Sequence, residues 1–485
     1  MENGTELRKV IYNVFLTQIQ FGAYRRGEKL PTMEETSAWL HVSIDTVRAA
    51  YLKLKDEGYI SLFKNVGATV KVSYDDQETE QFIQTFFALR REAMIDLASS
   101  MGALFGNAQW TGLKNASAVT MQAMKSLLGE EVATAPYAML EHLNQKYSAL
   151  GNGLLMRLVW QTFMFLHDPF FSIKENLRYF DQSTDYLPEV LSLCEKKDWP
   201  ALRGATDRSI EQLSFALNRF YMSRITMAPP ERKIIFSWSS YKKSKQICYS
   251  LAMDLLIAIS RGVYPVGSRL PSQAELAEQR GVSLSTVRRA LELLSGVGAV
   301  RSAKHAGTRV LPLEKATENS DFTKPVLQRR LLDMAEGLQV FALSCRAVSL
   351  LTFSSLEAAS VGEMCRALKA HKQWQRGETL SYFILGLIAE HAPYQAIRTV
   401  YTELLRQHFW GYALRGLKGS QETINAAYDP YYDALIASLE KMDFTQFSVE
   451  LERFMLYELR EAVHLLSQLS IPGVESILVP GENKS

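Results

Sequence analysis

Hydroxyl and guanidinium side chains occur in corresponding short segments of the two halves of this sequence, and two of them, a threonine and an arginine, stand at matching positions. The full set is Thr46 and Arg48 in the first half, and Ser285, Thr286, Arg288 and Arg289 in the second. Both kinds of group donate hydrogen bonds, and a guanidinium also carries a permanent positive charge. Such a set suits recognition of phosphates and of base edges in a groove. The chemistry that these residues offer is therefore binding.

An internal repeat holds these residues. Residues 24–70 and 264–310 align without a gap at an offset of 240, and 16 of the 47 aligned positions are identical. Chance identity between segments of ordinary composition is roughly 5–7% per position. The sequence therefore contains a duplicated module, and each half consists of one module followed by a larger region.

The module is predicted to contain three helices and a hairpin. The first helix spans residues 7–21, or 244–260 in the second copy. The second follows a proline and begins at Thr32 or Ser272, each with a glutamate three residues on, which is a capping box. Ser43 and Ser283 are expected to cap the third helix. The inward stripe of the third helix is Val47, Ala50, Tyr51 and Leu54, and its counterpart is Val287, Ala290, Leu291 and Leu294.

Two short apolar runs around Gly67 or Gly307 then predict a hairpin, or wing. A helix, a tight turn and a second helix with cations near its N-terminus is the geometry that enters a major groove. A small three-helix module that serves protein contacts is the alternative.

Both modules resemble the winged helix-turn-helix of the GntR family of bacterial transcription regulators. The resemblance rests on Gly-x-x-Leu-Pro-Ser/Thr, Val-Ser-x-x-Thr-Val-Arg and the Gly of the wing. It implies a mainly α fold, with two winged helix-turn-helix domains each followed by an all-α bundle. The implied DNA-binding residues are Thr32, Ser43, Thr46, Arg48, Lys64, Gly67, Ser272, Ser283, Ser285, Thr286, Arg288, Arg289, Lys304, Gly307 and Thr308.

Two cations that are usual in the family are missing from both copies. The position that is usually Arg after Pro-Ser is Glu34 or Ala274, and the residue after Val-Ser is Ile44 or Leu284. The charge of the copies also differs. Residues 261–310 hold eight cations and three anions, whereas residues 21–70 hold seven and six. Because phosphate contacts dominate DNA affinity, we expect the second copy to bind more strongly. The alternative is that these charges only form solvated faces.

The rest of the chain is predicted to be helical. The expected organisation is a winged domain at 1–74, a helical domain at 82–225, a linker at 226–243, a second winged domain at 244–312 and a second helical domain at 325–472. The order of the helices resembles the all-α effector domain of the fatty-acid-responsive GntR subgroup, called FCD. The metal ligands of that subgroup fall here on residues such as Ala138, Leu143 and Leu187, so no metal is predicted.

No cofactor is predicted either. The six histidines of the helical regions show no metal-ligand spacing, and each is expected on the surface or satisfied in the core. The aromatic residues of these regions are expected in the core, with an apolar effector pocket as the alternative. Arg157 and Arg398 are the candidates to pair an acidic effector.

Composition excludes several classes of protein. Four scattered cysteines do not form a disulfide framework, and no signal sequence or long apolar run is evident, so a cytoplasmic protein without a membrane span is expected. No enzyme motif is present. The sequence predicts a transcription regulator that binds an operator in double-stranded DNA under control of a small-molecule effector. Its halves are expected to pair as a covalent pseudo-dimer, with a homodimer of whole chains left open. A sensor or interaction protein that has lost DNA binding is the alternative.

Overall fold

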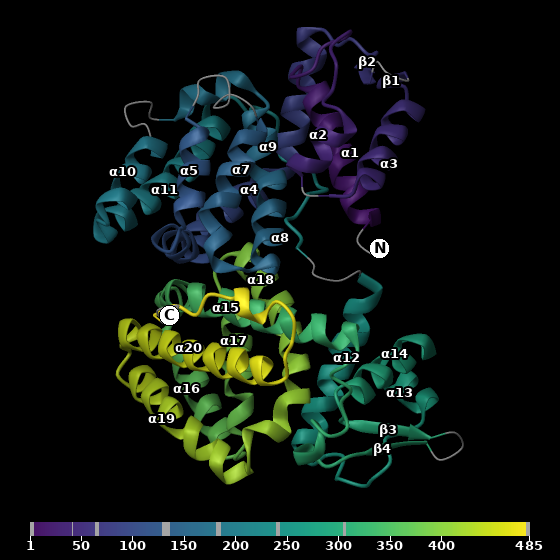
Figure 1. Cartoon of the computed structure of the whole chain (residues 1–485), viewed down its shortest axis with the longest axis vertical. Coiled ribbons are helices and arrows are strands. Elements are labelled where there is room, and N and C mark those ends of the chain that lie inside the picture. The colour runs from purple at the N-terminus through teal and green to yellow at the C-terminus, as the bar shows by residue number, and fades with distance from the viewer. Residues whose placement is uncertain are drawn as a thin grey trace. The chain divides into compact units, whose positions relative to one another are not determined.

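The computed structural model of the chain describes residues 4–40, 42–63, 67–128, 136–180, 186–238, 243–303 and 307–481. Internal packing divides the chain into two compact units. Unit 1 contains Met1–Gly102, Gln109–Ala149 and Met156–Ser237. Unit 2 contains Ala103–Ala108, Leu150–Leu155 and Trp238–Ser485. Each unit carries one winged module, called head 1 (residues 4–74) and head 2 (residues 243–312), and Figure 1 labels their elements.

Head 1 consists of three helices and an antiparallel hairpin. The elements are α1 (Gly4–Gln20), α2 (Met33–Trp39), α3 (Ile44–Asp56), β1 (Ile60–Phe63) and β2 (Gly67–Val70). In the hairpin, Ile60 lies opposite Val70. Helix α1 packs on α3, where the rings of Phe15 and Tyr51 meet edge to face at 5.2 Å. The buried Tyr51 hydroxyl donates to the carbonyl of Pro31 at 2.8 Å, which fixes α3 against the turn before α2.

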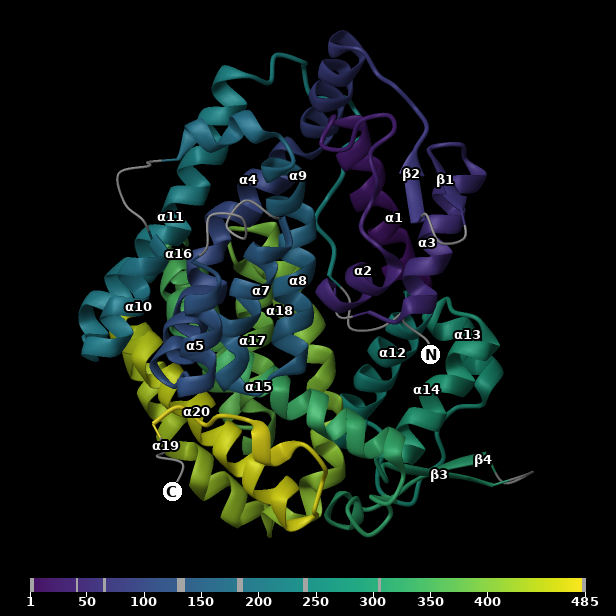
Figure 2. The same ribbon diagram turned by 45° about the horizontal axis from the view of Figure 1, so that its top comes forward.

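Head 2 repeats this arrangement. Its elements are α12 (Lys243–Ser260), α13 (Gln273–Arg280), α14 (Leu284–Gly296), β3 (Val300–Ala303) and β4 (Gly307–Val310), and Figure 2 shows the hairpin beside α14. Val300 lies opposite Val310, the same register as in head 1 at the offset of 240. Apart from the two hairpins, the described residues with regular structure are helical, which confirms the predicted fold class.

The helical region of unit 1 follows head 1. Its helices are α4 (Asp76–Lys114), α5 (Ala118–Ser126), α7 (Pro136–Tyr147), α8 (Gly153–Thr162), α9 (Asp168–Phe171), α10 (Tyr186–Lys196) and α11 (Trp199–Ser223). A π-helical turn, Phe163–His167, connects α8 to α9. The core of head 1 continues into this region, because Leu140, Trp160, Phe163 and Met164 belong to the same cluster of buried residues. Head 1 is therefore packed against its helical region.

The helical region of unit 2 is built around one buried helix. Its helices are α15 (Pro325–Ser354), α16 (Ala358–Lys372), α17 (Leu380–His391), α18 (Gln395–Leu405), α19 (Gln421–Glu440) and α20 (Phe444–Gln468). Helix α15 packs on α20, with the rings of Phe353 and Phe447 4.5 Å apart. Among the described residues α15 alone has the length and composition of a membrane span, and 72% of its apolar window is buried inside the protein. Core helices commonly have this composition.

Unit 2 also includes the segment Leu150–Leu155 from the first half of the sequence. The amide of Asn152 donates to Gln339 Oε1 at 2.7 Å and to the carbonyl of Glu336 at 2.8 Å. Gln339 in turn donates to the carbonyl of Leu150 at 2.8 Å. These side chains are buried, so the hydrogen bonds hold the segment firmly against α15.

Candidate nucleic-acid interface

The N-terminal turn of α3 projects from head 1 because the opposite face of the helix is buried. The buried residues are Val47, Ala50, Tyr51 and Leu54, which confirms the predicted stripe. Ser43 is the predicted N-cap, since its Oγ accepts from the amide of Thr46 at 3.3 Å. Its hydroxyl also lies 2.7 Å from Thr46 Oγ1. Arg48 is exposed beside this turn.

Helix α14 presents the corresponding turn of head 2. The predicted stripe is buried here too: Val287, Ala290, Leu291 and Leu294. Ser283 caps the helix by accepting from the amide of Thr286 at 3.2 Å, and its hydroxyl contacts Ser285 Oγ at 2.9 Å. Arg288 and Arg289 are exposed, and neither forms an ion pair with another described residue. Both guanidinium groups are therefore available to a partner.

The two turns differ in net charge. In head 1, Arg48 forms an ion pair with Asp45 at 2.5 Å, although both side chains are more than half exposed. Head 2 has Ser285 at the position of Asp45. A surface ion pair contributes little to stability. It does cancel the charge of Arg48, so the tip of α3 is neutral where the tip of α14 carries two positive charges.

The second helix of each head begins with a capping box, as predicted. Thr32 Oγ1 accepts a hydrogen bond from the amide of Glu35 at 3.1 Å. The carboxylate of Glu35 in turn accepts one from the amide of Thr32 at 2.8 Å. Ser272 and Glu275 form the same pair of hydrogen bonds in head 2. Thr32 and Ser272 are exposed.

The wings contain the remaining predicted contacts. Gly67 and Gly307 are exposed and have φ angles of +90° and +77°, a conformation that glycine adopts without strain. Thr308 is buried, and its hydroxyl lies 2.9 Å from Ser302 Oγ on the neighbouring strand. The predicted contacts Lys64 and Lys304 lie outside the described residues.

Head 2 also has three arginines in or beside its wing that the sequence prediction did not include. Arg301 on β3 lies directly opposite Arg309 on β4, and Arg309 also bridges to the backbone of Arg269. All three residues are exposed. Like charges opposite each other on two strands are destabilising, so this arrangement favours an anionic partner. The corresponding residues of head 1 are Lys29, Ser61 and Thr69.

The predicted effector contacts occupy different surroundings. Arg398 is half-buried, and its guanidinium donates to Gln395 Oε1 at 3.0 Å and to the carbonyl of Ala392. Its hydrogen bonds are therefore made to the first residue of its own helix, α18, and to the end of the preceding helix, α17. Arg157 is half-buried on α8.

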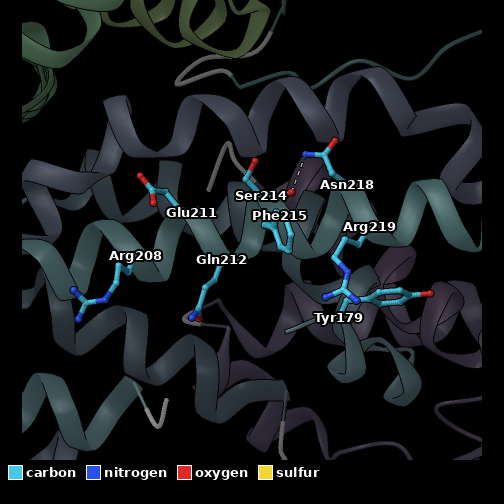
Figure 3. Close-up of a pocket in the computed structure, with 8 residues that line it drawn as sticks. All are labelled: Tyr179, Arg208, Glu211, Gln212, Ser214, Phe215, Asn218 and Arg219. Atoms are coloured by element: carbon cyan, nitrogen blue, oxygen red, sulfur yellow. Dashed lines mark hydrogen bonds between the residues drawn. The ribbon is translucent and has the colours of Figure 1, made fainter. Parts of the chain in front are cut away.

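An open pocket of about 580 Å³ lies along α11 (Figure 3). Its lining residues are Tyr179, Arg208, Glu211, Gln212, Ser214, Phe215, Asn218 and Arg219. Phe215 is 64% exposed, and Asn218 donates to the carbonyl of Ser214 at 2.9 Å (Figure 3). Most of the lining comes from one face of one helix, and neither Arg157 nor Arg398 is part of it.

The histidines of the helical regions are not all satisfied. His371 matches the prediction, because Nδ1 contacts the hydroxyl of Tyr432 at 2.7 Å and Nε2 contacts Thr379 Oγ1 at 3.3 Å. The prediction is wrong for His142, His167 and His408, which hold buried ring nitrogens without a hydrogen-bond partner among the described groups. Sequence spacing gave no signal of this, since it does not report what surrounds a ring. No three His, Cys, Asp or Glu side chains converge as a metal site within the described part of the chain.

Two stretches of the chain match the family model described as "Bacterial regulatory proteins, gntR family". They are residues 7–70 and 250–310, and they coincide with head 1 and head 2. This confirms both the predicted resemblance and the tandem duplication.

Curated relatives are transcription regulators of Escherichia coli (strain K12). The uncharacterized HTH-type transcriptional regulator YieP is 43% identical over 68 residues, which cover 14% of this chain and 30% of that protein. The Exu regulon transcriptional regulator is 27% identical over 130 residues, 25% of this chain and 50% of that protein. The Glc operon transcriptional activator is 33% identical over 100 residues, 20% and 39% respectively. The chain thus spans half or less of the length of these relatives.

Solved structures give matches of low TM-score. E. coli McbR/YncC has a TM-score of 0.25 at 19% identity, covering 46% of this chain and 98% of that one. Streptococcus agalactiae GntR has a TM-score of 0.21 at 16% identity, covering 44% and 99%.

Proposed function

We propose, from the premise that this chain is a GntR-family protein with two winged heads, that it is a sequence-specific DNA-binding transcription regulator. The observation that carries the proposal is the exposed tip of α14, where Arg288 and Arg289 lie free of ion pairs with described residues. A helix fits the major groove, and residues of its first turns reach base edges. Arginine also pairs with two acceptors of guanine at once.

The proposed contact surface combines the third helix, the second-helix cap and the wing of each head. In head 2 the proposed contacts are Ser272, Ser283, Ser285, Thr286, Arg288, Arg289, Arg301, Lys304, Gly307 and Arg309. In head 1 they are Thr32, Ser43, Thr46, Arg48, Lys64 and Gly67. The buried Thr308 holds the wing through Ser302. The arginines of the wing would contact phosphates, which fix position without reading sequence.

We propose that head 2 supplies most of the affinity. Head 2 exposes three arginines in or beside its wing and two on α14 that form no ion pair with a described residue, whereas Arg48 of head 1 is paired with Asp45. The Asp45–Arg48 pair also favours a second function for head 1 alone, a protein-contact module that has lost most of its DNA affinity. Two unequal heads suit an operator with unequal half-sites.

The two halves of the sequence are proposed to pair within one chain. The support is the set of buried hydrogen bonds that joins Asn152 of the first half to Glu336 and Gln339 of the second. Tethering raises the effective concentration of one head at the DNA once the other has bound. Light scattering coupled to size exclusion is expected to give the 54.9 kDa of a single chain, and a mass of two chains would contradict internal pairing.

We also propose that a small molecule controls DNA binding, that the protein is cytoplasmic and that it has no catalytic activity. An effector that binds one arrangement of the heads more tightly than another increases the population of that arrangement. The resulting shift in DNA affinity is set by the difference between the effector's affinities for the two arrangements.

DNA binding tests the main proposal. Genomic DNA fragments that the full chain selects are fluorescently labelled. Each fragment is titrated with protein at physiological salt, and its fluorescence anisotropy is measured. The double variant R288A/R289A is expected to lose at least about tenfold in affinity, because each good arginine–base pairing is worth about 1–3 kcal/mol. R366A removes another exposed arginine, on α16, and is the control. No fragment selected, or equal affinity in both variants, would contradict the proposal.

A further inference from the structure

A large aliphatic side chain is exposed at the first position of the third helix in both heads. Leu284 follows the cap Ser283 in α14 and is 51% exposed. Ile44 follows the cap Ser43 in α3, is 37% exposed and does not belong to the core of head 1. The two residues are equivalent at the offset of 240. Each therefore presents an apolar group to whatever meets the tip of its helix.

Within the described residues of the heads, this is the one position at which both copies expose a large hydrophobic side chain. The other exposed hydrophobic residues of head 1 have polar or small counterparts in head 2: Trp39, Leu52 and Phe63 correspond to Gln279, Glu292 and Ala303. The same holds in reverse for Val263 and Val266, which correspond to Ala23 and Arg26. The side chain of Leu7, the counterpart of the exposed Ile247, lies outside the described residues. Single exposed hydrophobic residues are ordinary on a protein surface, whereas one repeated at both helix tips indicates a shared role.

Leu284 lies on the part of α14 that would meet DNA. It is four residues from Arg288, so the two side chains share one face of the helix, one turn apart. The helix rises 1.5 Å per residue, which places them about 6 Å apart along its axis, or about two base-pair steps. The neighbouring hydroxyls are engaged locally, because Ser283 Oγ lies 2.9 Å from both Ser285 Oγ and Thr286 Oγ1. A duplex that receives Arg288 in its groove would therefore meet Leu284 as well.

We propose that Leu284 and Ile44 each select a thymine in the major groove through contact with its C5-methyl group. Among the DNA bases, thymine alone presents a methyl group there. An aliphatic side chain neither donates nor accepts a hydrogen bond, so it discriminates by the apolar surface that it buries. Any other base would place a polar edge against this side chain and lose a hydrogen bond to water.

This inference rests on the proposed function and names one base that the heads select. The residue beside the aliphatic group differs between the heads, Asp45 in head 1 and Ser285 in head 2. The two half-sites of the operator should therefore share the thymine and differ next to it. In the half-site of head 2, the thymine is expected about two base pairs from the one that Arg288 contacts.

Replacement of thymine by 2′-deoxyuridine tests the contact, because it removes the methyl group and leaves pairing with adenine unchanged. Each thymine of a genomic fragment that the full chain selects is replaced singly, and binding is measured by fluorescence anisotropy at physiological salt. One replacement in the half-site of head 2 is expected to weaken wild-type binding about fourfold, which corresponds to roughly 0.8 kcal/mol for one buried methyl-sized group.

L284A separates this contact from other effects of uracil on the duplex. It is expected to bind the thymine fragment at least about fourfold more weakly than the wild type, and to bind the thymine and deoxyuridine fragments equally. It should fold normally, because Leu284 is already half exposed and alanine favours a helix. L284I introduces the residue of head 1 and should retain the preference for thymine. A lost preference in L284I would contradict the role proposed for Ile44.

I247A is the matched control. Ile247 is 54% exposed on α12, the first helix of head 2, and its truncation should leave both the affinity and the preference for thymine unchanged. The inference is overturned, while DNA binding stands, if a selected fragment binds and no thymine is sensitive to deoxyuridine. It is equally overturned if the sensitivity persists in L284A or is lost in I247A. If the chain selects no fragment, the proposed function fails and this inference fails with it.

Discussion

The side-chain amide of Gln18 donates a hydrogen bond to Asp168 Oδ1 at 2.8 Å, and both side chains are buried. Gln18 lies on α1 of head 1 and Asp168 begins α9, so the bond joins the head to the helical region of unit 1. Burial raises the pKa of Asp168 to about 7, although the bond from Gln18 opposes the shift. Gln18 Oε1 is buried without a partner among the described groups. Asp168 also forms no ion pair with another described residue, so burial favours its neutral, protonated form.

Replacement of Asp168 by Asn is expected to change how stability depends on pH. The pKa of Asp168 is about 7 in the fold and near 3.8 in the unfolded chain, so the native state holds an extra proton between these values. Wild-type stability should therefore fall as the pH rises from about 4 to 7 and level off above 7. D168N mimics the neutral acid, so above pH 7 it should have a higher melting temperature than the wild type. The corresponding gain in unfolding free energy is at most about 4 kcal/mol.

The check is a series of thermal melts from pH 4 to 8. D207N, on a half-exposed aspartate that pairs with Arg203, is the control and should not remove the pH dependence. A D168N curve parallel to the wild type throughout the series would show that Asp168 does not titrate in this range.

Replacement of Asp45 by Ser should strengthen DNA binding through head 1. Serine is the residue of head 2 at this position, and the change frees Arg48 from its ion pair. One more free cation at the interface increases the slope of log affinity against log salt by about 1. Anisotropy titrations at several salt concentrations measure this slope. D56S removes the same charge from the other end of α3, and an equal effect of D56S would mean that only overall charge matters.

The wing and the helix of head 2 should differ in what they contribute. R309T introduces the residue of head 1 at the strand position, and it should lower affinity about equally for all sequences and reduce the salt slope by about 1. R288A should instead relax the preference at one base pair, at a cost of about 1–3 kcal/mol for the preferred base. Competition between fragments with single base changes separates the two effects. A uniform loss for R288A would place Arg288 on the DNA backbone.

Two glycines of α4, one in close contact with α7 and one in open space, provide a matched test of helix packing. G112A places a methyl group 2.1 Å from the backbone oxygen of Lys146, so the helices must move apart, at a cost of about 1–3 kcal/mol or more. G102A meets nothing within 4 Å and should be neutral or stabilise the helix by up to about 1 kcal/mol. Thermal melts distinguish the two. An unchanged melting temperature in G112A would show that α4 and α7 are not held this closely in solution.

Much of the two heads was predictable from local sequence. The caps at Ser43 and Ser283, the boxes at Thr32 and Ser272, and the buried stripes all follow from short-range patterns, and two copies of each pattern reinforced the assignment. The pairing of Asp45 with Arg48 is also local, at three residues on one helix, yet whether it forms depends on the rotamers at an exposed turn.

The helical regions were less predictable. Their histidines looked ordinary because spacing along the chain does not reveal what packs around a ring or an amine. Lys146 is buried in the folded unit, and its carbonyl lies close to Gly112 of α4, which the sequence around it does not indicate. The same limit applies to Gln18 and Asp168, which are 150 residues apart and meet only in the folded unit.

The sequence by itself determined that two winged heads exist, which face of each third helix is buried, and that the second copy is the more cationic. These properties depend on residues within a few turns of one another, so periodicity and capping report them. The tertiary structure alone decided which polar groups are enclosed without partners, because burial depends on segments distant along the chain. It also decided which cations remain free, since an ion pair forms only where side chains actually meet.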